Sequence, residues 1–83
     1  MNTPEGNVEK FNALLIRILE IPESTITDGL SPDDVKTWDS FNGLLIASEL
    51  ESLFDLQFSI EDISGVKNIG DMKQVLRKHG VKI

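Results

Sequence analysis

The sequence has no cysteine, and it contains a single histidine and a single tryptophan among its 83 residues. Without cysteine, the chain forms no disulfide, thiol nucleophile or thiolate metal site. His79 lies near the end of the chain, and no serine–base–acid set typical of a hydrolase is present. The segment from Asp28 to Asp39 has the length of a calcium loop, but Pro32 stands where a ligand belongs. We therefore expect no hydrolase activity and no metal site.

Basic residues are also few, because eight Lys and Arg against fourteen Asp and Glu give a net charge of −6. Nucleic acids are bound largely through Lys and Arg, so this balance argues against a DNA or RNA partner and permits basic protein partners. No apolar run reaches the roughly 18 residues that cross a bilayer. Residues 1–5 lack the charged and apolar regions of a secretion signal. We expect a cytoplasmic protein with no membrane partner.

Helical periodicity is present in a chain of single-domain length, so residues 1–83 are expected to form one domain. Apolar residues recur at helical spacing from Val8 to Leu19, and Thr3-Pro4-Glu5 offers a cap, a first-turn proline and an early acid. This helix is expected to end near Glu20. Residues 22–38 show no period and predict a long connection, which Ile26 and Leu30 are expected to anchor on the bundle.

The most apolar segment runs from Ser40 to Phe54 and predicts a second helix with Asp39 as its N-cap. Apolar residues cover more than half of its circumference, which predicts central burial together with an exposed apolar side. We expect Ile46, Leu50 and Phe54 to point inward and Leu45 to point outward.

Two further helices follow. Ser59 and Asp62 have the spacing of a capping box for a short helix that Gly65 ends. Asn68 and Asp71 have the same spacing at the start of a last helix, which has Lys78 and His79 in its final turn and Gly80 beyond. We read His79 as a helix C-terminal charge. The prediction is an all-α, four-helix bundle with a long first loop and a short third helix.

Ser40 would occupy the first helical position, beside unsatisfied backbone N–H groups and the positive end of a helix dipole. Such a position favours a phosphate group. The alternative interpretation is an ordinary helix-start serine. Trp38, two residues earlier, fits either recognition by another protein or cover for the edge of the core.

Asp39-Ser40-Phe41, followed by an apolar helix that closes on Glu49-Leu50-Glu51-Ser52-Leu53-Phe54, resembles the acyl carrier protein family. The resemblance runs without a gap from about Ile21 to Met72. It implies that Ser40 carries a 4′-phosphopantetheine arm, attached from coenzyme A by a phosphopantetheinyl transferase, with Asp39, Trp38 and Phe41 beside it. The arm would hold an acyl or aminoacyl group as a thioester. The carrier itself would perform no chemistry and would be a monomer that serves loading and acyl-transfer enzymes. The resemblance also implies the residues that would line an acyl pocket: Leu44, Ile46, Leu50, Phe54, Ile63 and Val66.

The sequence departs from the family pattern at several places. Thr37 replaces the usual glycine, and Phe41 replaces the common leucine and is expected at the core end of the helix. Glu51 and Glu61 match the acids that meet partner enzymes, but Leu45 stands where another acid is common. We interpret this as a specialised, stand-alone carrier that docks partly through Leu45, rather than the housekeeping fatty-acid carrier. An unmodified adaptor that binds a protein through the apolar second helix is the alternative, and an unrelated regulator that forms homodimers is a third possibility.

Overall fold

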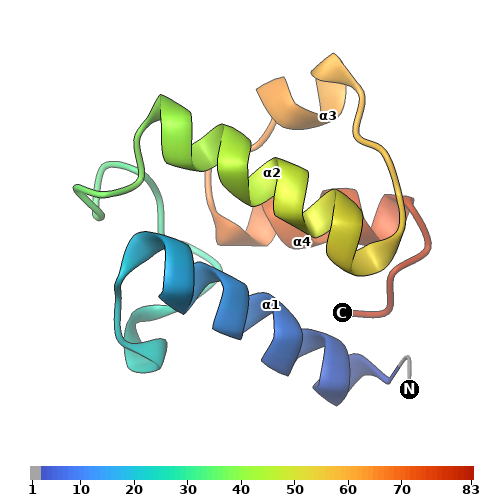
Figure 1. Ribbon diagram of the computed structural model, residues 1–83, viewed down its shortest axis with the longest axis horizontal. Helices are drawn as coiled ribbons and strands as arrows, with labels where there is room; N and C mark the ends of the chain where they lie inside the picture. The colour runs from blue at the N-terminus through green and yellow to red at the C-terminus, as the bar shows by residue number, and fades with distance from the viewer. Residues whose placement is uncertain (1–2) are drawn as a thin grey trace.

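The computed structural model describes residues 3–83, and these form four α-helices and one 3-10 turn (Figure 1). The elements are α1 (Pro4–Leu19), η1 (Glu23–Thr25), α2 (Ser40–Phe54), α3 (Ile60–Ser64) and α4 (Ile69–Lys78). No strand occurs among the described residues. The predicted all-α fold, with its long first connection and short third helix, is confirmed.

Local capping explains where most of these helices begin and end. The Thr3 hydroxyl accepts a hydrogen bond from the Gly6 amide (3.1 Å) at the start of α1, and Glu20 ends that helix in the left-handed conformation (φ 56°). Ser59 and Asp62 form the expected capping box of α3. The capping box expected at the start of α4 is only half formed. The Asn68 side chain accepts from the Asp71 amide, but the Asp71 carboxylate accepts from the Lys67 amide instead of completing a box.

The long connection between α1 and α2 is held at both ends and in its middle. The Thr37 hydroxyl donates to the Leu19 carbonyl (2.6 Å), which gives this departure from the family pattern a structural role. The first amides of α4, those of Ile69 and Gly70, donate to the carbonyls of Leu30 (3.0 Å) and Asp28 (2.8 Å). Ile26 and Leu30 pack against the core, as expected. The connection therefore supplies acceptors that the start of α4 would otherwise lack.

The core lies where α1, α2 and α4 meet, with α3 across one end of the bundle (Figure 1). Its most completely buried apolar side chains are Phe11, Leu15, Leu19, Ile46, Leu50, Ile69 and Leu76. The two ends of the described chain lie together, because the Asn7 side chain donates to the Lys82 carbonyl (2.8 Å).

Two expectations for the exposed side of α2 are wrong. Phe41, expected at the core, is 73% exposed. Leu45, expected to point outward, is half-buried and packs against the core. Leu45 lies one turn before Glu49, whose carboxylate pairs with Arg17 of α1, so this flank of α2 faces α1.

Two helical glycines should respond oppositely to alanine. A Cβ at Gly43 would meet only the Trp38 ring, at 3.6 Å, so Gly43→Ala should stabilise the fold by about 0.5–1 kcal/mol. A Cβ at Gly70 would lie 3.2 Å from the Asp28 carbonyl oxygen that accepts from Gly70 itself. Gly70→Ala should therefore destabilise the fold by about 1 kcal/mol. Urea denaturation of both variants measures the difference, and equal effects would contradict this account of the loop contact.

Candidate functional site

Ser40 is the first residue of α2 and is exposed. The Asp39 carboxylate accepts from the Asn42 amide (2.9 Å), and the Asp39 carbonyl accepts from the Gly43 amide (2.8 Å). The amides of Ser40 and Phe41, like the Ser40 hydroxyl, make no hydrogen bond with any described residue. The predicted cap at Asp39 is confirmed, and it leaves two backbone donors and one hydroxyl free at the positive end of α2.

A cavity of about 660 Å³ begins beside Ser40 and extends between α2, α3 and α4. Its walls are mainly aliphatic and aromatic. Five of the six residues that the resemblance places along an acyl pocket do line this cavity, namely Leu44, Ile46, Leu50, Ile63 and Val66. Phe54 does not line it. That residue packs against the core near the far end of α2, which places it apart from the other five expected residues.

Further wall residues are Gly43, Ala47, Phe58, Met72 and Val75. The periodicity of α4 marks Met72 and Val75 as members of an apolar stripe, which we would assign to the core from the sequence. In the structure this stripe has a double role, because Ile69 and Leu76 are fully buried while Met72 and Val75 also face the cavity. Helical spacing identifies an inward side, but it does not distinguish a packed neighbour from an open space.

Trp38 is 7% exposed, and its side chain forms part of the cavity wall near Ser40. The indole ring lies beside the first turn of α2, where Gly43 offers no side chain against it. Of the two interpretations left open for Trp38, its burial in the core cluster supports cover for the edge of the core. Its position at the cavity also brings it close to the serine.

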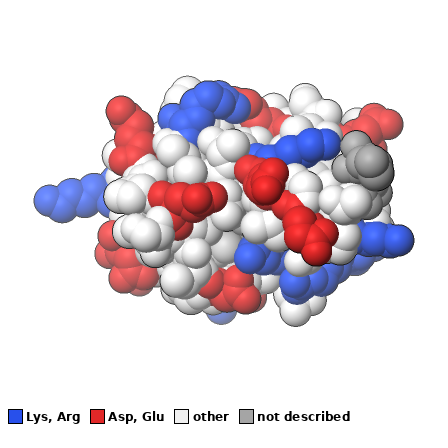
Figure 2. Space-filling model, turned by 90° about the horizontal axis from the view of Figure 1, so that it is seen from below, with Lys and Arg blue, Asp and Glu red and all other residues white. Residues whose placement is uncertain are grey.

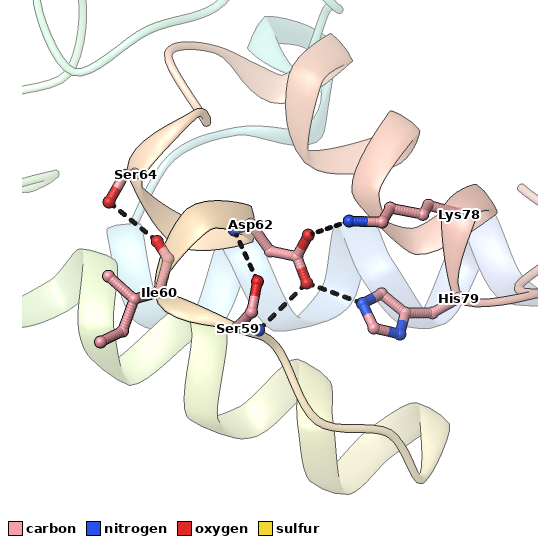
Figure 3. A network of polar contacts seen from close by, with 6 residues as sticks. All are labelled: Ser59, Ile60, Asp62, Ser64, Lys78 and His79. Carbon is pink, nitrogen blue, oxygen red and sulfur yellow. Dashed lines mark hydrogen bonds and ion pairs between the residues drawn. The ribbon is translucent and has the colours of Figure 1, made fainter.

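A polar network fixes α3 to the end of α4 (Figure 3). The buried Asp62 carboxylate accepts from Lys78 Nζ (2.7 Å) and from the Ser59 amide (3.0 Å), and it contacts His79 Nε2 (2.8 Å). The His79 ring also meets Phe58 edge to face, with centroids 5.7 Å apart. His79 lies at the C-terminus of α4 as its C-cap residue, one position beyond the last turn in which it was expected, and sequence reasoning did not predict its contact with Asp62 of α3.

These contacts stabilise the charged form of Asp62. The hydrogen bonds from Lys78 and His79, followed by that from the Ser59 amide, hold the pKa of the Asp62 carboxyl far below its usual range, and burial opposes them only partly. Asp62 therefore remains ionised at neutral pH. Because α3 forms one wall of the cavity, the network also fixes that wall.

The two expected acidic contacts differ in their surroundings. Glu51 Oε2 accepts from the Phe58 amide (2.8 Å), so this carboxylate orders the chain between α2 and α3. Glu61 is exposed on α3. The face of the molecule seen in Figure 2 has acidic side chains interspersed with basic ones, so the net negative charge does not form one acidic field there.

Exposed apolar side chains gather instead around the cavity. Phe41 (73% exposed) and Leu44 (61%) lie on the first turns of α2, and Ile60 (84%) and Ile63 (37%) lie on α3. We call these four residues the apolar rim. Leu44 and Ile63 belong to both the rim and the cavity wall. An apolar surface of this kind beside a cavity is typical of a site that contacts another molecule.

Comparisons with known proteins address the family. No protein-family model matches the chain, and no curated protein matches it. A solved structure described as "a putative acyl carrier protein" from Mycobacterium tuberculosis is similar at 30% identity with a TM-score of 0.76, and the match covers 86% of this chain and 95% of that one. The chain belongs to the acyl carrier protein family. Membership agrees with the resemblance of residues 21–72 and with a carrier role. No helix among the described residues has the length and apolarity that crossing a membrane requires.

The Asp62 network predicts a pH dependence. Its lowered pKa in the folded state means that Asp62 stabilises the fold above the unfolded value of about 3.9, and that this stabilisation is lost as the pH falls below it. Wild type should therefore lose stability more steeply than Asp62→Asn between about pH 5 and pH 2. Urea denaturation across this range measures both slopes.

The matched control is Glu61→Gln, which removes an exposed carboxylate from the same helix. Its stability should fall with pH as steeply as that of wild type. Parallel curves for wild type and Asp62→Asn would contradict the role assigned to the network.

Proposed function

We propose that this member of the acyl carrier protein family carries a 4′-phosphopantetheine arm on Ser40 and presents an acyl or aminoacyl group to partner enzymes. The observation that carries the proposal is the position of the Ser40 hydroxyl, which is exposed, makes no hydrogen bond to residues 3–83 and is located at the edge of a mainly apolar cavity. The chain has no cysteine, so a thiol must come from elsewhere. When attached, the arm supplies that thiol and holds the cargo as a thioester.

The residues around Ser40 fit such a group. A phosphodiester on the hydroxyl would lie at the N-terminus of α2, where the Ser40 and Phe41 amides are free to donate and the helix dipole favours negative charge. Asp39 is already bonded to the Asn42 amide, so its carboxylate maintains the helix start. The apolar walls would shelter an alkyl group from water.

We also propose that partner enzymes approach over the apolar rim. The rim residues flank the serine and the cavity, so an enzyme that reaches the serine or its cargo must come close to them. Leu45 is less available than its position in the sequence indicates, because it packs toward α1. Glu61 is exposed on the same helix as Ile60, and the proposal includes it as a polar contact for the partner.

Modification is tested by intact mass after incubation with coenzyme A and a promiscuous phosphopantetheinyl transferase. Wild type should gain the mass of one phosphopantetheine, and Ser40→Ala should gain none. The variant should fold normally, since the hydroxyl has no hydrogen bond to lose among the described residues. No gain on folded wild type would reject the proposal and favour the unmodified adaptor, for which the exposed rim would be the binding surface.

The rim is tested by the rate of the same modification. Phe41→Ser removes the exposed ring next to Ser40, and we expect about a tenfold lower kcat/KM for the transferase if that ring is buried in the complex. Leu53→Ser is the matched control, because Leu53 is also exposed on α2 (38%) but lies near its far end. Equal rates for both variants and wild type would exclude a contact at Phe41.

A further inference from the structure

The polar side chains along the cavity wall are Trp38, Asp39, Ser40 and Asp62. Two of them already have their partners. The Asp39 carboxylate accepts from the Asn42 amide, and both oxygens of Asp62 are engaged in the network with α4. The Ser40 hydroxyl is exposed and is the proposed attachment point. The Trp38 indole N–H is therefore the one buried side-chain donor of this wall that remains to be explained.

The indole nitrogen makes no hydrogen bond to any described residue, although Trp38 is 93% buried, being 7% exposed. Among the described residues, Asn12 Oδ1 is the side-chain nitrogen or oxygen atom that has neither a hydrogen-bond partner nor accessible surface. The Trp38 nitrogen also lacks a hydrogen-bond partner, so it must have accessible surface. Gly43 leaves room beside it, because even an added Cβ would lie 3.6 Å away. We infer that the N–H group opens onto the cavity.

This donor sets a chemical requirement on what the cavity holds. An indole nitrogen only donates, so it needs an acceptor, and an unpaired buried donor costs free energy. The wall residues with side-chain oxygens are Asp39, Ser40 and Asp62, and none of these oxygens accepts a hydrogen bond from the indole nitrogen. A plain hydrocarbon would leave the donor unpaired, and an ammonium group would place donor against donor. A carbonyl oxygen satisfies it.

We propose that Trp38 is a positioning residue whose indole N–H donates a hydrogen bond to a carbonyl oxygen inside the cavity. This inference rests on the proposed modification of Ser40, because the arm and its cargo are what would bring a carbonyl there. The carbonyl comes either from an amide of the arm or from the thioester. With either carbonyl, the hydrogen bond would hold the arm and its cargo at the Ser40 end of the cavity, while the rest of the wall contributes apolar contact.

The single tryptophan makes the test direct, because the uniformly labelled protein has one indole N–H resonance. The resonance is recorded by proton–nitrogen NMR for the unmodified protein and for protein modified from coenzyme A, octanoyl-coenzyme A or its S-octyl thioether analogue. The last of these lacks the thioester carbonyl. Intact mass verifies each modification, and Ser40→Ala treated identically is the control.

A hydrogen bond should move the indole proton downfield and slow its exchange with solvent by about fivefold or more. Movement in all three modified forms would identify an arm carbonyl, and movement in the octanoyl form alone would identify the thioester. A resonance that stays at its unmodified position in all three forms would overturn the inference. A missing mass gain would instead reject the modification of Ser40, so the two failures are distinguishable.

Discussion

The hydrogen bonds that Asp39 accepts from amides in the first turn of α2 determine the positions on which the site depends. They stop the helix from extending backward into the connection and so fix which residue is first. Once Ser40 holds that place, the helical repeat turns Ile46 and Leu50 inward and leaves Phe41 and Leu44 outside. The Asn42 side chain also donates to the Thr37 carbonyl (2.7 Å), so the same turn holds the end of the loop against the helix.

The second constraint concerns α3, which has only five residues. A helix of this length is not stable alone, because the free-energy cost of helix nucleation exceeds the stabilisation that the hydrogen bonds of one turn provide. Its capping box satisfies its own first amides, and the contacts that Lys78 and His79 make with the Asp62 carboxylate attach it to α4. These contacts leave the outer residues Ile60 and Ile63 free of the core. The wall of the cavity is thus held by a few polar contacts at one edge and not by close packing.

Sequence reasoning predicted the features that depend on neighbours three or four residues apart. The caps at Thr3, Asp39 and Ser59 and the helix boundaries belong to this group, because each is decided within one turn. It failed where a side chain meets a distant segment. The burial of Leu45 depends on where α1 lies, and the partners of Asp62 come from 16 and 17 residues further along the chain. The cavity itself is a property of packing, so the apolar pattern of α4 could not separate Met72 and Val75 from a filled core.

The bond between the Asn7 side chain and the Lys82 carbonyl has a consequence for how the molecule can be handled. It brings both ends of the described chain to one corner, whereas α2 begins at the opposite corner of the view in Figure 1. A surface linker or a fused protein at either end would thus leave the serine facing away from the attachment. The domain can therefore be attached through either end of the described chain while the start of α2 stays accessible to other proteins.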